Sequence, residues 1–349
     1  MSGFGGGIIG GERDWDREIL HNAKHSSMTD FQSMRDSTLL PELISLAADR
    51  DSAAPALTSG KSTLTFGELH DAVTGFSSGL LSLGIQRGER VAVYLEKRFE
   101  TVITSFGAPA AGGVFVPLNP LLKPEQVGYI MRDCNVRVLV TSPERLALLT
   151  DTVKQCHDLR HVVVLDSSES LQRSGPISYF RWSEMLAMPQ RPGHRVIDTD
   201  VVGILYTSGS TGKPKGVVLS HRNMVAGAKS VASYLENHSG DTLLGALPLS
   251  FDAGFSQLTT AFHVGARVVL LNYLLPRDVI KAIEREGVTG LTAVPPLYIQ
   301  LTQLPWPESI TEHLRYFANT GGRMPRETLA ALHRHLPKTR PFLMYGLTE

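Results

Sequence analysis

The sequence has little cysteine, since only Cys134 and Cys156 occur among its 349 residues. Two cysteines this far apart exclude a disulfide framework and a CxxC metal site. We expect both to be ordinary small hydrophobic side chains in a protein of a reducing compartment, the cytoplasm.

The sequence also lacks an excess of charge of either sign, because 34 Lys and Arg balance 34 Asp and Glu. Nucleic acid or an anionic membrane as the main partner would call for a basic excess. We therefore expect neither as the main partner, although a local basic patch stays compatible with this balance.

Long hydrophobic runs are missing as well. The longest, residues 103–118, is interrupted by Gly107, Pro109, Gly112 and Gly113, and it is too short to span a bilayer. The N-terminus, MSGFGGGIIGGERDWD, lacks the basic and continuous apolar segments of a signal peptide. It contains a formal GxGxxG, but no strand precedes the glycines. We predict a flexible tail over residues 1–37 rather than a dinucleotide site.

From residue 38 onward, short β-branched runs alternate with helical patterns, which is typical of α/β proteins with mostly parallel sheets. A stretch rich in Ser, Pro and Arg, residues 167–199, interrupts the alternation. We predict a first αβ subdomain at 38–199 and a second at 200–349. The predicted strands are VAVYL (91–95), VFVPL (114–118), VRVLVTS (136–142), HVVVLD (161–166), VVGILYTSGS (201–210), DTLLGALPL (241–249), ARVVLLN (266–272), GLTAVP (290–295), LRYFANTGG (314–322) and FLMYGLTE (342–349).

One short segment, YTSGSTGKPKG (206–216), combines glycines, hydroxyls and two lysines directly after a predicted buried strand. It is not a Walker loop, because Pro214 follows Gly212-Lys213 and Thr207 stands at the first glycine position. Glycines can turn backbone N–H groups toward an anion, and the hydroxyls and lysines can bind its oxygens. This favours a phosphate-binding loop over the alternative, a solvated turn.

Further motifs follow in a fixed order around this loop: LTFGEL (64–69), GGVFVPLNPLLKPEQVGYIM (112–131), LPLSFD (247–252), VPPLY (294–298), NTGGRMP (319–325) and YGLTE (345–349). With them, the sequence resembles the AMP-forming adenylating enzymes over about residues 38–349. That superfamily includes acyl-CoA synthetases, luciferases and peptide-synthetase adenylation domains. The resemblance implies the large N-terminal domain of the adenylate-forming fold, without the C-terminal domain that carries a catalytic lysine.

The resemblance implies a two-step reaction that uses ATP and Mg²⁺. A substrate carboxylate attacks the α-phosphate of ATP, which releases pyrophosphate and leaves an acyl-adenylate. A thiol of CoA, or of a carrier protein's phosphopantetheine, then displaces AMP. By resemblance, the β- and γ-phosphates would be held by Thr207, Ser208, Gly209, Ser210, Thr211, Gly212 and Lys215, with Thr207 and Lys215 in catalytic roles.

The resemblance assigns the nucleotide's other end to two later motifs. Tyr345 would stack on adenine, Thr348 would contact the α-phosphate, and Glu349 would bind Mg²⁺. Gly321, Gly322 and Arg323 would line the adenine. Without the resemblance, Tyr345 reads as a core aromatic residue, Glu349 as a surface charge and the two glycines as a tight turn. His221 receives no role beyond packing or a helix start.

The substrate signal is SFDAGF (250–255), where acyl-CoA synthetases usually show a histidine. By its position in this motif, Asp252 resembles the aspartate that pairs with the substrate's α-ammonium in amino-acid-activating domains. The desolvation cost of a buried carboxylate favours the same role, because such a group in an acyl pocket needs a cation or hydrogen-bond donors. The alternative is an N-cap of the following helix. By position, the acyl pocket would also be lined by Ala253, Ser256, Ala293, Ala318, Thr320 and Met344, mostly small and uncharged.

These features lead to one expectation and two alternatives. We expect an AMP-forming ligase that adenylates a small or cyclic amino acid for a carrier protein, similar to free-standing prolyl-AMP ligases and exosortase-associated acyl-CoA ligases. The first alternative is an acyl-CoA ligase for a fatty or aryl acid. The second is a nucleotide-binding module without catalysis. Because no closing helix follows the last predicted strand, we expect a part of a longer protein. Since the resemblance implies a catalytic lysine on a C-terminal domain that is missing here, we expect little turnover by this chain alone.

Overall fold

The computed structural model describes residues 36–166, 175–208 and 213–348. Residues 37–349 group into one compact unit. The N-terminal glycines, for which a flexible tail is predicted, lie outside the described residues.

One seven-stranded sheet has the strand order β7-β6-β5-β3-β4-β8-β9. All of its neighbouring strands are parallel except β8 and β9, which form an antiparallel hairpin. The strands are β3 (Arg90–Tyr94), β4 (Val114–Pro117), β5 (Val136–Thr141), β6 (His161–Val164), β7 (Ser178–Arg181), β8 (Val201–Thr207) and β9 (Lys215–Ser220).

The second seven-stranded sheet has the order β14-β13-β12-β10-β11-β1-β2. Its strands are parallel apart from β2, which returns antiparallel beside β1. They are β1 (Pro55–Ser59), β2 (Ser62–Thr65), β10 (Thr242–Gly245), β11 (Arg267–Leu270), β12 (Gly290–Ala293), β13 (Tyr316–Asn319) and β14 (Arg340–Leu343). The predicted α/β class with mostly parallel sheets is confirmed.

Strands from both sides of residue 199 pair within each sheet. β1 and β2 join the sheet otherwise built from residues 242–343, and β8 and β9 complete the sheet of residues 90–181. The subdomain boundary at residue 199 stays a prediction. In both sheets, however, strands from before residue 199 pair with strands from after it.

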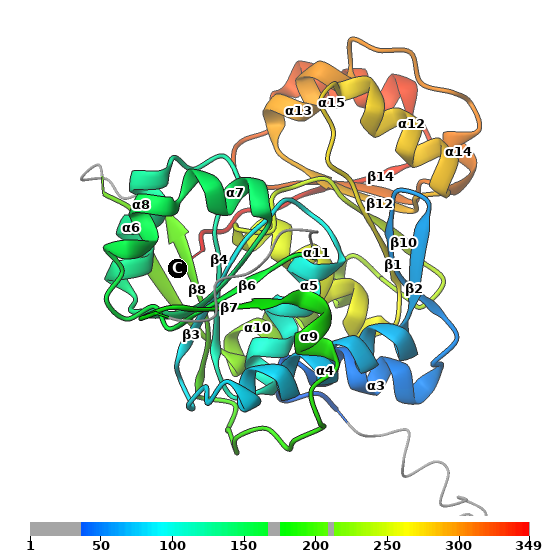
Figure 1. Cartoon of the computed structure of the whole chain (residues 1–349). Coiled ribbons are helices and arrows are strands. Elements are labelled where there is room, and N and C mark those ends of the chain that lie inside the picture. Colours follow the sequence, from blue (N-terminus) through cyan, green and yellow to red (C-terminus); the bar gives the residue numbers. More distant parts are fainter. Residues whose placement is uncertain (1–35, 167–174, 209–212, 349) are drawn as a thin grey trace, which may run out of the picture. The chain divides into compact units, whose positions relative to one another are not determined.

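Helices separate and cover the two sheets (Figure 1). α3, α4, α5, α10 and α11 contribute side chains to a core that also contains residues of both sheets. α12, α13 and α15 pack on the other face of the second sheet, and α6 and α8 on the other face of the first. The helices are α3 (Glu42–Arg50), α4 (Phe66–Ser82), α5 (Phe99–Ala110), α6 (Pro124–Asp133), α7 (Pro143–Leu148), α8 (Thr150–Lys154), α9 (Trp182–Leu186), α10 (His221–Tyr234), α11 (Asp252–Val264), α12 (Pro276–Glu286), α13 (Pro295–Leu301), α14 (Ile310–His313) and α15 (Arg326–His335).

Helix α11 is held in the central core by aromatic stacking. Its Phe255 is fully buried and stacks on Phe115 of β4 and on Phe106 of α5, with ring centroids 4.7 and 5.6 Å apart. Gly254 lets the first turn of α11 approach the chain before it, because a Cβ there would lie 1.9 Å from the backbone oxygen of Pro248. Packing therefore fixes the position of the helix that begins at Asp252.

No helix among residues 36–166, 175–208 and 213–348 is long and apolar enough to cross a membrane.

Candidate functional site

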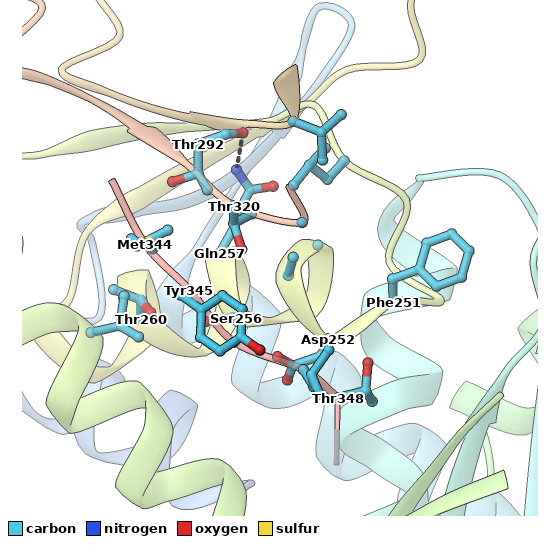
Figure 2. Close-up of a pocket in the computed structure, with 18 of the residues that line it drawn as sticks. Phe251, Asp252, Ser256, Gln257, Thr260, Thr292, Thr320, Met344, Tyr345 and Thr348 are labelled. Carbon is cyan, nitrogen blue, oxygen red and sulfur yellow. Dashed lines mark hydrogen bonds between the residues drawn. The ribbon is translucent and has the colours of Figure 1, made fainter. Parts of the chain in front are cut away.

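A cavity of about 710 Å³ lies against α11, where the chain leaves several strands of the second sheet. Segments that follow β10, β12, β13 and β14 contribute to its wall, together with α10 and the end of β8. Ligand sites in open parallel sheets typically lie at the carboxyl ends of the strands. Figure 2 shows the cavity with residues of α11 and of the segment after β14 on its wall.

One face of α11 forms a wall of this cavity. Six of its residues line the cavity. Gly254 is one, and the other five, Asp252, Ala253, Ser256, Gln257 and Thr260, are spaced by one, three, one and three positions. Residues at this spacing share one side of a helix. The face therefore presents a line of oxygen-bearing side chains along about two turns.

Asp252 is the first residue of α11, and its carboxylate reaches the cavity. The N-cap of the helix is Phe251, and no side chain caps the helix end, so the alternative interpretation of Asp252 as an N-cap is wrong. In the described part of the chain, no hydrogen bond or ion pair to the Asp252 carboxylate is present. Burial raises the pKa of this carboxyl above its usual value. The side chain is thus a partly desolvated acid that no cation of the described residues pairs with.

The described residues on either side of the predicted phosphate loop belong to the antiparallel strands β8 and β9. Thr207, the last residue of β8, lies opposite Lys215, the first residue of β9, and Thr207 and Ser208 line the cavity. Lys215 is exposed and does not line the cavity. Gly209, Ser210, Thr211 and Gly212, also predicted to bind phosphate, lie outside the described residues.

The segment after β14 lines the same cavity. Met344, Tyr345 and Thr348 all contribute to its wall. Tyr345 is 95% exposed, so the reading as a core aromatic residue is wrong, and its ring is open for stacking. Glu349, the predicted Mg²⁺ ligand, lies outside the described residues.

The turn after β13 contributes Thr320 and Gly321 to the wall. Gly321 has a φ of 71°, a left-handed conformation that glycine adopts without strain, and the chain bends at Gly321 and Gly322. Asn319 fixes the turn by donating from Nδ2 to the backbone oxygen of Gly322 (2.7 Å). Gly322 and Arg323 are exposed and do not line the cavity.

The remaining substrate-binding predictions separate into two groups. Ala253, Ser256, Thr320 and Met344 line the cavity with Asp252. Ala293 and Ala318 do not, because both are fully buried in the hydrophobic core on strands β12 and β13. Period-two alternation along a buried strand cannot by itself distinguish a core side chain from a pocket side chain.

Sequence reasoning missed several lining residues, above all Gln257, Thr260, Thr292 and Tyr234. Tyr234 of α10 donates its hydroxyl to Sδ of Met344 (3.0 Å), which connects α10 to the segment after β14. A usable signal existed for α11, since Asp252, Ser256 and Thr260 follow each other at four-residue spacing. Tyr234 carries no such signal, because α10 reaches the cavity only through tertiary packing.

Two other predictions concern His221 and metal binding. His221 is 1% exposed, and its Nδ1 accepts a hydrogen bond from the backbone N–H of Leu40 (3.0 Å), in agreement with a packing role at the start of α10. In the described residues, no cluster of three or more His, Cys, Asp and Glu side chains could hold a metal ion. A Mg²⁺ ion bound to nucleotide phosphates needs only one or two protein carboxylates, so Glu349 alone would fit this chemistry.

The chain is similar to ligases that activate carboxylic acids. It is 31% identical over 325 residues to L-proline–[L-prolyl-carrier protein] ligase of Streptomyces coelicolor, covering 90% of this chain and 60% of the relative. It is 31% identical over 294 residues to a long-chain-fatty-acid–CoA ligase of Thermus thermophilus, covering 82% and 52%. The structure of VinN in complex with 3-methylaspartate matches with a TM-score of 0.74 and 27% identity, covering 89% of this chain and 79% of VinN.

The two mostly parallel seven-stranded sheets match the N-terminal domain of the adenylate-forming fold. Residues 45–349 match the family described as AMP-binding enzyme, and the chain belongs to this family. The chain spans between about half and 60% of the length of the two curated relatives named above.

Proposed function

We propose that this chain forms the adenylation site of an ATP-dependent ligase that activates a small or cyclic amino acid for transfer to a carrier protein. One observation carries the proposal: the Asp252 carboxylate is half-buried in the cavity and has no cation partner among the described residues. A desolvated carboxylate is costly unless a positive group meets it. An α-ammonium group of the substrate would supply that charge.

The relatives agree with this proposal without deciding it. One relative names L-proline and its carrier protein, and the solved structure of VinN contains 3-methylaspartate. Another relative is a long-chain-fatty-acid–CoA ligase, and a fatty acid carries no ammonium group that could pair with a carboxylate. The presence of Asp252 in the cavity wall favours the amino acid.

The remaining parts of the cavity suit the other substrate, ATP. The exposed ring of Tyr345 offers a stacking surface for adenine, and Thr348 and Thr207 bring hydroxyls to the same cavity. Hydroxyl donors and backbone N–H groups stabilise charge that develops on phosphate oxygens. Mg²⁺, which we expect Glu349 to bind, would neutralise phosphate charge when present.

The proposal is tested by amino-acid-dependent exchange of pyrophosphate into ATP, using the protein at its full natural length. The panel contains amino acids, including proline and its analogues, together with fatty and aryl acids. We expect exchange with amino acids only. Exchange with a fatty or aryl acid and none with any amino acid would refute the proposal.

A pair of isosteric variants isolates the role of the carboxylate. Asp252→Asn removes the charge and keeps the shape, and we expect kcat/KM for the amino acid to fall roughly a hundredfold or more, because the buried ammonium loses its counter-ion. Asp151→Asn is the control, since Asp151 is 88% exposed on α8 and pairs with the exposed Lys154. It should leave exchange unchanged.

A further inference from the structure

Two polar atoms on the wall of the cavity are buried without a partner. They are Oε1 of Gln257 and Oγ1 of Thr260, and neither has a hydrogen bond in the described part of the protein. The two residues are 5% and 1% exposed, and both line the cavity. Buried polar atoms normally have a hydrogen-bond partner, so these two unpartnered atoms beside one cavity are candidates for hydrogen bonds to a ligand group.

The orientation of the Gln257 amide is fixed by two backbone carbonyls. Its Nε2 donates to the backbone oxygens of Leu244 (3.0 Å) and Thr292 (3.2 Å), and the second bond is drawn in Figure 2. A flipped amide would place its oxygen against both carbonyls, which would be repulsive. Both N–H hydrogens are therefore used, and Oε1 remains as an acceptor that only a donor can satisfy.

The hydroxyl of Thr260 is also left free by its own helix. A threonine in a helix commonly donates to the carbonyl four residues earlier, which here is Ser256. That carbonyl instead accepts the hydroxyl of Thr259 (3.2 Å). The Thr260 hydroxyl therefore keeps its capacity to donate and to accept a hydrogen bond, which a group reaching it from the cavity would use.

Both residues lie on the same helix face as Asp252, further along α11. A rise of 1.5 Å per residue places Gln257 about 7.5 Å and Thr260 about 12 Å from Asp252 along the helix axis. A substrate whose ammonium meets Asp252 would point its side group along this face. Most of the surrounding wall is apolar, with Leu243, Leu247 and Val294 among the lining residues.

We propose that Gln257 and Thr260 are specificity-determining residues that bind a hydrogen-bond donor on the side group of the activated amino acid. The preferred substrate thus carries a hydroxyl or N–H group on its side group. An acid without such a donor would leave the Gln257 oxygen buried and unpaired. The inference rests on the proposed function and narrows its substrate class.

The test compares matched pairs of amino acids in pyrophosphate exchange with the full-length protein. The pairs are threonine and valine, 4-hydroxyproline and proline, and tyrosine and phenylalanine, and each differs by one hydroxyl. Glutamine and asparagine are added as amide-bearing acids. We expect the best substrate to bear a donor and to exceed its apolar partner or analogue in kcat/KM by roughly tenfold to a hundredfold.

Thr260→Val tests the site without disturbing the fold, because it removes a hydroxyl that has no hydrogen-bond partner in the described part of the chain. We expect it to lower the preference for the donor-bearing acid about tenfold, with unfolding stability equal or higher. Thr259→Val is the control on the same helix, since Thr259 is buried but does not line the cavity. It should leave the preference unchanged.

Two results would overturn the inference, and they differ in what else they affect. In the first result, amino acids support exchange, but the apolar member of each pair reaches the same kcat/KM as the donor-bearing member, or Thr260→Val leaves the preference intact. Water then satisfies Oε1 of Gln257 and Oγ1 of Thr260, and only this inference fails. If fatty or aryl acids exchange and amino acids do not, the proposed function fails, and the inference fails with it.

Discussion

At the scale of single residues, the cavity contains a group that is unfavourable for the fold and useful for binding. Burial raises the pKa of Asp252, so the folded protein takes up a proton there at a higher pH than the unfolded chain. At pH values above the pKa of Asp252 in the folded protein, the ionised carboxylate therefore lowers the free energy of unfolding. At pH values below the pKa of Asp252 in the unfolded chain, this penalty disappears. A residue kept at such a cost points to a functional role.

Replacing Asp252 by Asn should accordingly raise stability while it removes amino-acid binding. We expect a higher urea midpoint for Asp252→Asn than for the wild type at pH 7, and a difference that vanishes near pH 3. Urea unfolding at both pH values measures it. A lower midpoint for the variant at pH 7 would show that the carboxylate has a stabilising partner.

His221 makes stability sensitive to acid. Burial lowers the pKa of its imidazole to about 4, and Nδ1 must stay unprotonated to accept the N–H of Leu40. The neighbouring carboxylates of Asp200, Asp198 and Glu42 raise the pKa but do not outweigh burial. Because the unfolded chain takes up the proton first, stability falls as the pH drops from about 6.5 to 4.

The variant His221→Asn keeps an acceptor near Nδ1 and cannot titrate. Between pH 7 and pH 4.5 we expect the wild type to lose about 2–3 kcal/mol more unfolding free energy than this variant, from the size of the pKa shift. Urea titrations at the two pH values supply the comparison. Equal losses in both proteins would contradict the role of His221.

At the scale of secondary-structure elements, a buried carboxylate joins the start of β10 to the chain before β13. Asp241 has a fully buried side chain and accepts two hydrogen bonds from Arg315, at 2.9 and 2.6 Å. Hydroxyl Oγ1 of Thr289 and Nδ2 of Asn237 also donate to it. Burial raises the pKa of Asp241, but these donors outweigh burial and lower it overall.

We expect Asp241→Ala to cost about 3–5 kcal/mol of unfolding free energy, because it leaves the donors of a buried network unpaired. The matched control is Glu236→Ala, which removes the exposed ion pair with Arg340 and should cost less than about 1 kcal/mol. Chemical denaturation of the three proteins separates the two cases. Similar losses in both variants would show that the Asp241 network adds nothing beyond a surface pair.

At the scale of the whole molecule, each sheet depends on strands from both halves of the chain. β11 pairs with β1 on one side, and β4 pairs with β8. The central core also contains side chains from both sheets. Residues 37–349 are therefore expected to unfold together rather than as two units divided at residue 199.

Separate expression of residues 38–199 and 200–349 tests this dependence. Each piece would lack strands that complete its sheet and would expose unpaired edges and half of the central core, so we expect neither to show a cooperative thermal transition. Circular dichroism in the near and far ultraviolet during heating is the measurement. A cooperative transition in either piece alone would instead support two independent subdomains with a boundary near residue 199.

The sequence by itself determined the class of fold, most of the parallel strands and the family. Continuous apolar runs such as those of β3, β5 and β11 are visible because strands buried on both faces must be apolar throughout. The missed strands β1, β2, β7 and β9 are short or half-exposed, so local pattern carries little information about them. The family motifs also located Asp252, Thr207 and Tyr345, all of which line the cavity.

Only the tertiary structure decided which side chains share the cavity. It placed Ala293 and Ala318 in the core and brought Gln257, Thr260 and Tyr234 to the wall. It also removed the capping interpretation of Asp252, because Phe251 occupies the cap position. The physical reason is the same in each case: whether a buried position meets packed atoms or open space depends on elements distant in the sequence.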